Sequence, residues 1–294
     1  FKTLEGNASQ VPKTNTSGKI ESDFYDLTEL PLPAFNQKIS LSSNSDSGAS
    51  GGIRTTSNQS GSVLIVADYA VGNMARLARD SVTGQYFPTH IFSGTGSSTG
   101  KLGIVVLGSY VYYFYDNGAT MAARRVDLAD LSNETAMTIS TPIDTSGAAP
   151  CNANTFTDGK YIYVQSNNST TFCKLTVSGT TFTQVTTITA DTAFDNSDSC
   201  FFFDGKKVVM VECIGVGPTG NYRMTSFTDP TATPSMTTFG IGTMAKDATA
   251  TTGSRPPVVA NIDTTRMYVG QIHLVYDNAT DQREGFSIFP VTKP

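Results

Sequence analysis

A tight turn followed by an alternating apolar strand recurs five times, and this repeat constrains the fold more than any other feature of the chain. The five openings read GSVLIVADY, GSYVYYFYD, DGKYIYVQS, DGKKVVMVE and TTRMYVGQI. Their equivalent apolar positions recur every 46 to 59 residues and are Val63, Val111, Ile162, Val208 and Met267. Each unit has room for about four short strands, which is the content of one β-propeller blade. A single meander cannot bury both of its faces, so the units are expected to stack around an axis.

The repeat predicts an all-β fold, a β-propeller of four-stranded antiparallel blades that spans residues 36–294. We count five blades; a six-bladed ring would need a further blade within residues 218–257, where proline, glycine and threonine obscure the pattern. The early segment NQKISLS, residues 36–42, is well placed to close the ring by completing the last blade. A β-sandwich or an elongated β-structure is the alternative, and the period favours the propeller.

Composition narrows the possible partners. Charged residues make up 15% of the chain and hydrophobic residues 38%, so the surface is expected to be polar but largely neutral. A net charge of −5, with no cluster of lysine and arginine, argues against nucleic-acid binding. No apolar run approaches the roughly 20 residues that span a bilayer, so no membrane insertion is expected.

Residues 1–35 contain no meander and are predicted to form an extended N-terminal arm. This segment nevertheless carries more apolar side chains than a solvated tail has use for. We interpret them as anchors that attach the arm to another protein; they are Ile20, Phe24, Tyr25, Leu27 and Leu30.

Within the arm, the polar segment KTNTSGKIESDF, residues 13–24, is punctuated by one glycine. It resembles segments of bacteriophage tail fibres and other virion appendages that bind host receptors. The resemblance implies an extracellular protein of the virion surface that contacts other virion proteins through residues 1–35. It further implies adsorption to a host receptor, often a glycan, and a homo-oligomeric assembly. The propeller body departs from the pattern, because fibre tips are more often trimeric β-structures.

For a binding role, the relevant residues are tyrosines and amides that follow the first strands of the repeat. Aromatic rings stack on sugars, and Asn or Asp side chains hydrogen-bond to hydroxyl groups. Loops at one end of a propeller would bring such residues together. The candidates are Tyr69, Asn73, Tyr115, Asp116, Asn117, Asn167, Asn168, Asn221, Tyr222, Tyr276 and Asn278.

No catalytic constellation is recognisable, and the sequence predicts that the chain is not an enzyme. A glycosidase needs two carboxylates, and Glu212 is the best single candidate because it lies within a strand pattern. His90 and His273 lie among apolar neighbours, where packed strand histidines are expected, and no G-x-S-x-G motif accompanies them. The alternatives to a virion protein are a secreted glycan-binding lectin, a glycoside hydrolase with the same fold, and a purely structural decoration protein.

No cofactor is expected. An oxygen-rich loop with Asp191, Asp195 and Asp198 could hold Ca²⁺, although its spacing does not match the EF-hand and a solvated turn is the favoured interpretation. The four cysteines form no C-x-x-C pair, which argues against zinc. They are expected to be buried reduced thiols and are Cys151, Cys173, Cys200 and Cys213.

Overall fold

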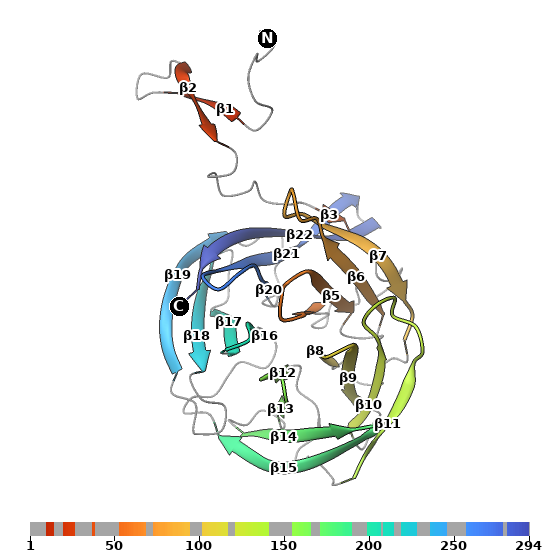
Figure 1. Cartoon of the computed structure of the whole chain (residues 1–294). Helices are drawn as coiled ribbons and strands as arrows, with labels where there is room; N and C mark the ends of the chain where they lie inside the picture. The colour runs from red at the N-terminus through yellow and green to blue at the C-terminus, as the bar shows by residue number, and fades with distance from the viewer. Residues whose placement is uncertain are drawn as a thin grey trace.

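Every regular element of the described chain is a β-strand (Figure 1). The computed structural model describes residues 10–14, 20–26, 37–38, 53–68, 73–94, 102–116, 121–140, 155–165, 171–189, 199–206, 208–214, 219–227, 236–245, 257–278 and 281–293. Across these ranges the strands run from β1 to β22, with no helix. The all-β prediction is confirmed.

Three of the sheets are four-stranded and antiparallel. The first contains β4 (Ile53–Ser57), β5 (Val63–Asp68), β6 (Met74–Arg79) and β7 (Tyr86–Phe92). Another contains β16 (Ser199–Phe203), β17 (Val208–Ile214), β18 (Thr219–Phe227) and β19 (Met236–Ala245). The last contains β20 (Pro257–Asn261), β21 (Arg266–Asn278), β22 (Asp281–Thr292) and β3 (Gln37–Lys38).

An eight-stranded sheet lies between the first sheet and the other two along the chain. Its first half contains β8 (Leu102–Leu107), β9 (Tyr110–Asp116), β10 (Met121–Asp127) and β11 (Thr135–Ile139). Its second half contains β12 (Thr155–Thr157), β13 (Ile162–Gln165), β14 (Thr171–Ser178) and β15 (Thr181–Thr189). Each half is an antiparallel meander, and a short parallel pairing of the outer strands β11 and β15 joins them. Each half therefore matches the four-stranded unit of the other sheets.

The first strands of the successive units form a ring around a common axis (Figure 1). β4 contacts β8, β8 contacts β12, β12 contacts β16, β16 contacts β20, and β20 returns to contact β4. The early strand β3 pairs with β22 and adds the fourth strand to the last sheet. This pairing places residues 37 and 38 where the sequence predicted a ring-closing strand. The architecture is that of a β-propeller.

The core lies between neighbouring units, and β9 shows how the sequence builds it. Val111, Tyr113 and Tyr115 alternate with Tyr112 and Phe114 along this strand. The odd-numbered set packs against side chains of β5 and β6, whereas the even-numbered set packs against β13, β14 and β15. Successive side chains of a strand point to opposite faces. β9 is therefore apolar on both faces because it is buried between two neighbouring units.

A further apolar cluster fills the space between β12–β14 and β16–β17. Phe156 stacks on Tyr163 with 4.7 Å between ring centroids, and on Phe201 with 5.0 Å. Burial of these large rings supplies hydrophobic stabilisation at the interface of two units. Cys173, which lies in β14, is a buried thiol and fits the sequence prediction.

The N-terminal segment contains a hairpin instead of a wholly extended chain. β1 (Gln10–Thr14) pairs antiparallel with β2 (Ile20–Asp26) in a two-stranded sheet of their own. Of the predicted anchors, Ile20, Phe24 and Tyr25 belong to β2. Leu27 and Leu30 lie outside the described residues. The difference arises because the two strands, which the sequence pattern did not separate from an extended chain, pair with each other.

Candidate functional site: the axial pocket

Antiparallel meanders give each unit two distinct ends. The connection between the first and second strands lies at one end, and the connection between the second and third strands lies at the other. Because the first strands surround the axis, all first-to-second turns approach it at the same end of the ring (Figure 1). These are the turns that the repeat marks in the sequence.

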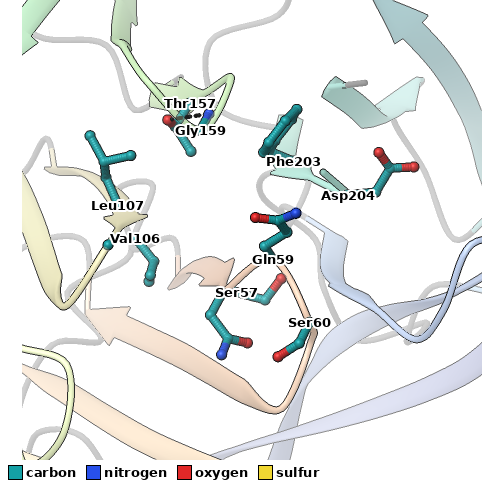
Figure 2. Close-up of a pocket in the computed structure, with 11 residues that line it drawn as sticks. Ser57, Gln59, Ser60, Val106, Leu107, Thr157, Gly159, Phe203 and Asp204 are labelled. Atoms are coloured by element: carbon teal, nitrogen blue, oxygen red, sulfur yellow. Dashed lines mark hydrogen bonds between the residues drawn. The ribbon is translucent and has the colours of Figure 1, made fainter. Parts of the chain in front are cut away.

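A pocket of about 530 Å³ opens at that end of the axis (Figure 2). Its lining comes from residues 57–60 of the first sheet, residues 106–108 at the end of β8, Thr157 and Gly159 at the end of β12, and Phe203 and Asp204 at the end of β16. Four of the units therefore share one cavity. Its volume is within the range of about 300–1,000 Å³ that is typical of small-molecule sites.

An Asn or Asp side chain fixes the backbone of four of these turns. Asn58 Oδ1 accepts a hydrogen bond from the Val63 amide at 3.0 Å, and Asp158 Oδ1 accepts one from the Tyr161 amide at 2.7 Å. Asp204 and Asp263 make equivalent bonds to the amides that follow them. Such local side-chain bonds favour turns. The pocket therefore has a well-defined backbone on most of its sides.

Two glycines allow the turns to approach one another closely. Gly61 has a φ of +65°, and a Cβ at this position would overlap the carbonyl of Asn261 in the last sheet. Gly205 has a φ of +99°, and a Cβ there would collide with the side chain of Gln59, which comes from the first sheet. Glycine adopts positive φ without steric cost. The Gln59 side chain therefore extends from the first sheet to the turn of the β16–β19 sheet.

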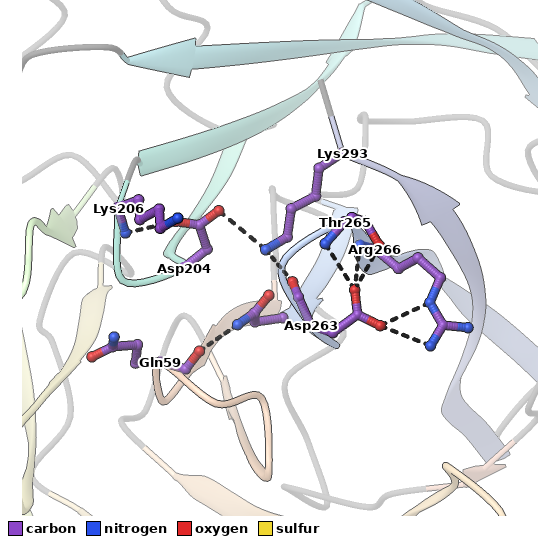
Figure 3. Close-up of polar contacts among 8 residues, drawn as sticks. Gln59, Asp204, Lys206, Asp263, Thr265, Arg266 and Lys293 are labelled. Carbon is purple, nitrogen blue, oxygen red and sulfur yellow. Dashed lines mark hydrogen bonds and ion pairs between the residues drawn. The ribbon is translucent and has the colours of Figure 1, made fainter.

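A buried ion pair lies beside the pocket (Figure 3). Lys293 Nζ lies 3.1 Å from Asp204 Oδ2 and donates to the Asp263 carbonyl oxygen at 2.5 Å. The two side chains are only 2% and 6% exposed. The other Asp204 oxygen, Oδ1, accepts from the Lys206 amide at 2.9 Å. The C-terminal lysine thus joins the turns of two neighbouring sheets.

The Asp263 carboxylate is stabilised in its charged form. Partial burial opposes the charge, but hydrogen bonds from the Thr265 and Arg266 backbone amides and from the Arg266 guanidinium outweigh it. The pKa of Asp263 is therefore held well below its ordinary value. Its Oδ2 also forms an ion pair with Arg266 at 2.7 Å. Asp263 acts as the negatively charged cap of the last turn.

Ser57 has a hydroxyl group that makes no hydrogen bond within the described part of the chain. Its side chain belongs to a residue that is 5% exposed, it lines the pocket, and its Oγ has no hydrogen-bond partner among the described residues. A buried hydroxyl without a partner costs about 1–3 kcal/mol. A hydroxyl or carbonyl group of a bound molecule would remove this cost.

Together these groups define what the pocket can bind. Gln59 supplies amide donors and an acceptor, Ser57 and Ser60 supply hydroxyls, and Asp204 supplies carboxylate oxygens. Phe203 supplies an aromatic ring. Hydroxyl-rich ligands with an apolar face match this combination. No group of three or more His, Cys, Asp or Glu side chains suitable for a metal occurs among the described residues.

The sequence-predicted binding residues that the structure describes follow strand connections at the opposite end of the ring. Asn73, Tyr115 and Asp116, together with Asn221, Tyr222, Tyr276 and Asn278, lie beside second-to-third strand connections. The others, Tyr69, Asn117, Asn167 and Asn168, lie outside the described residues, as do Asp191, Asp195 and Asp198 of the Ca²⁺ candidate.

Tyr115 and His90 have surroundings that differ from those that the sequence predicted. Tyr115 is only 7% exposed; its ring stacks on Tyr113, and its hydroxyl accepts a hydrogen bond from Arg124 at 3.1 Å. It is therefore a core residue and not a rim aromatic. His90 is exposed on the outer strand β7, so the expectation of a packed histidine is wrong. An outer strand has no unit beyond it to cover its apolar pattern.

The pocket residues were not recognised from the sequence as a site. The turns NQSGS, LGS, TDGK and FDGK were identified only as punctuation between strands. Their useful signal is that every unit places a turn at the equivalent position. In a closed ring these equivalent turns meet at the axis.

Comparisons with known proteins yield structures only, because no family model and no curated protein matches the chain. A GH43_1 enzyme from Xanthomonas citri complexed with xylose has a TM-score of 0.48 at 8% identity, covering 88% of this chain and 90% of that one. The α-L-arabinofuranosidase from Podospora anserina in complex with cellotriose has a TM-score of 0.45 at 12% identity, covering 89% and 97%. The phage phi92 endosialidase has a TM-score of 0.43 at 10% identity, covering 92% of this chain and 55% of that one.

These structures correct the prediction that the chain is not an enzyme. That prediction depended on few glutamates, no tryptophan and no familiar motif. The similar structures include a GH43_1 enzyme, an arabinofuranosidase and an endosialidase.

No helix in the described ranges has the length and apolar character needed to cross a membrane.

Proposed function

We propose that this chain is a carbohydrate-binding β-propeller of five blades, and that the carbohydrate binds in the axial pocket. The observation that carries the proposal is the pocket of about 530 Å³ shared by four units (Figure 2). Its lining combines hydroxyl, amide and carboxylate groups with the Phe203 ring. Ser57 adds a buried hydroxyl whose oxygen has no partner among the described residues.

The chemistry of the lining favours a sugar over other small ligands. Sugars present many hydroxyls that both donate and accept, and they present an apolar face that packs on aromatic rings. A purely apolar ligand would leave the Ser57 and Asp204 oxygens without new partners. A charged phosphate would meet the Asp204 carboxylate and, within the lining, no cationic side chain.

The five-blade count is part of the proposal and is supported by the cyclic contacts of β4, β8, β12, β16 and β20. A ring of this size leaves a narrow axis, so turns from several blades can contact one monosaccharide. A rim formed by the tyrosines and amides beside the second-to-third strand connections would lie at the other end of the same axis. It is the competing location for the glycan.

The test is a glycan array probed with the full chain, followed by titration of each bound glycan. Gln59→Ala and Ser57→Ala are expected to weaken binding because both residues line the pocket. Gln85→Ala is the matched control, since it removes an amide from a turn at the same end that does not line the pocket. Equal effects of Gln59→Ala and Gln85→Ala would contradict the location. Incubation with bound glycans and chromatography of the products determines whether the chain also hydrolyses them.

We further propose that residues 1–35 attach the propeller to a larger virion assembly. Support comes from the KTNTSGKIESDF resemblance and from the β1–β2 hairpin, which forms a sheet of its own. Deletion of residues 1–35 should abolish incorporation into the assembly while leaving glycan binding intact. Loss of glycan binding on deletion would show that the segment belongs to the binding unit.

A further inference from the structure

The carboxylate at the pocket lining determines which carbohydrates the site can accept. Asp204 is the one acidic residue of the lining, and no lysine, arginine or histidine lines the described pocket. We infer that the axial pocket selects uncharged sugars and rejects acidic ones such as uronates. This inference rests on the proposed carbohydrate-binding function of the same pocket.

The lysine that is paired with Asp204 is not available to a ligand. Lys293 has a side chain that is 2% exposed, and its ammonium is directed at Asp204 Oδ2 and at the Asp263 carbonyl (Figure 3). It neutralises a carboxylate that already belongs to the protein. A second anion entering the pocket would therefore share one committed lysine with the Asp204 carboxylate and the Asp263 backbone carbonyl.

The other charged side chains near Asp204 do not make the pocket attractive to an anion. Lys206 follows Asp204 in the same turn, but its side chain is exposed, and the bond it makes to Asp204 comes from its backbone amide. Arg266 is paired with Asp263 at 2.7 Å, and Asp263 keeps a depressed pKa and therefore its negative charge. Asp158 Oδ2 accepts from the Tyr163 hydroxyl, so this acid faces its own turn. The whole chain is also acidic, with a net charge of −5.

Neutral sugar hydroxyls, by contrast, gain from the same carboxylate. A carboxylate oxygen has more than one acceptor site, so Asp204 can keep its bonds to Lys293 and Lys206 and still accept a hydroxyl. Hydrogen bonds to a charged acceptor are stronger than those between neutral groups. The groups that hold Asp204 in place therefore orient an acceptor for a neutral polyol.

The experiment compares sugars that differ in one group. Methyl glycosides of glucose, galactose, mannose and xylose are titrated calorimetrically against the full chain, beside the methyl glycosides of glucuronic, galacturonic and mannuronic acids. Each uronate replaces a hydroxymethyl group by a carboxylate of similar size. We expect at least one neutral glycoside to bind, and its uronate to bind at least about tenfold more weakly at low salt. The difference should shrink as salt is added.

A variant identifies the group responsible. Asp204→Asn combined with Lys293→Met removes both members of the ion pair and leaves no buried charge behind, and its thermal unfolding is checked first. The ratio of neutral to acidic affinity should fall at least about fivefold in this variant, whatever the change in absolute affinity. If the double variant does not fold, the salt dependence of the wild-type ratio remains the deciding readout.

The possible failures are distinct. A uronate that binds as well as its neutral parent overturns the inference and leaves the proposed function standing. A wild-type discrimination that does not respond to salt or to the double variant also overturns it. Binding of none of these glycosides overturns the proposed function, and the inference with it.

Discussion

Ser57 and Thr155 are two buried residues whose hydroxyl oxygens have no hydrogen-bond partner in the described part of the chain. Comparing them distinguishes an effect on stability from an effect on ligand binding. Both are 5% exposed, but only Ser57 lines the pocket. Selection for stability alone would disfavour both hydroxyls, because a buried polar group without a partner lowers the free energy of unfolding. A ligand gives a reason to keep the one that lines the pocket.

We expect Ser57→Ala to leave the free energy of unfolding unchanged or to raise it slightly, while glycan affinity falls about fivefold. Thr155→Val is the matched control, because it removes the other unpaired hydroxyl and keeps the side-chain shape. It should leave affinity unchanged. Urea unfolding and calorimetric titration measure the two effects. A loss of affinity in both variants, or in neither, would contradict the role of Ser57.

Gly61 and Gly108 form a second matched pair, since both occupy first-to-second turns with similar φ values of +65° and +61°. A Cβ at Gly108 meets nothing within 4 Å, whereas one at Gly61 overlaps the Asn261 carbonyl. Gly108→Ala should cost about 1 kcal/mol through backbone strain alone. Gly61→Ala should cost about 3 kcal/mol or more, because two sheets must separate. Equal losses in denaturant unfolding would show that the two sheets do not approach closely at Gly61.

At the scale of single elements, the first-to-second turn of the last sheet carries a carboxylate, Asp263, whose charge makes the stability of the fold depend on pH. Asp263 has a folded-state pKa below its ordinary value, and it caps the turn through the Thr265 and Arg266 amides. A depressed carboxyl pKa contributes stability that is present above the unfolded value of about 3.9. That contribution is lost as the pH falls through the folded pKa.

The free energy of unfolding should therefore decline below about pH 4, and Asp263→Asn should make this decline shallower. Asparagine keeps the acceptor that caps the turn but loses the ion pair with Arg266. Urea unfolding of both proteins between about pH 6 and pH 2.5 checks this. Identical slopes in the acid range would show that Asp263 titrates in the folded protein as it does in the unfolded chain.

Local periodicity made most of these elements predictable. In β9 the run YVYYFYD indicated a strand, and the strand is buried on both faces as a propeller requires. The short parallel pairing of Thr138 with Thr181 in β11 and β15 had no such signal, because pairing between distant segments leaves no local pattern. The exposure of His90 on β7 was missed for a related reason. Inner and outer strands can share a pattern while differing in what covers them.

At the scale of the whole molecule, the ring is held together by contacts between its first and last sheets. Tyr86 of the first sheet packs edge-to-face on Tyr268 of the last sheet, with 5.8 Å between ring centroids, while its hydroxyl donates to the Gly61 carbonyl within the first sheet. Tyr268 in turn donates to the Gly84 carbonyl at 3.0 Å. Lys293 adds the buried link to Asp204. Aromatic packing therefore closes the ring between the first and last sheets, and the buried charge pair joins the last sheet to the β16–β19 sheet.

Lys293→Met should lower the free energy of unfolding by about 3 kcal/mol, because the buried Asp204 carboxylate loses its lysine partner. Lys206→Met is the control: it removes an exposed lysine that follows Asp204 in the same turn and should change stability by less than about 0.5 kcal/mol. Denaturant unfolding compares the two. If both lysines contribute equally, the Lys293–Asp204 pair does not hold the β16–β19 sheet and the last sheet together.

The candidate site was predictable only in part, because its lining residues come together only when the ring of units closes. Aromatic and amide residues such as Tyr276 and Asn278 attracted attention by type, and their strand positions place them at the end opposite the pocket. Gln59 belongs to a turn of ordinary composition, NQSGS, and Ser57 is the strand residue directly before it. Their importance comes from convergence with Phe203 and Asp204, which lie almost 150 residues away along the chain.

The measurement that tests the central claim most directly is a crystal structure of the full chain with the best-binding neutral glycan from the array. The account predicts the sugar in the axial pocket, with hydroxyls bonded to Ser57 Oγ and Asp204 and a ring face against Phe203. A sugar bound instead at the second-to-third strand connections, beside Asn221, Tyr222 or Tyr276, would contradict the axial site and return the function to the opposite rim.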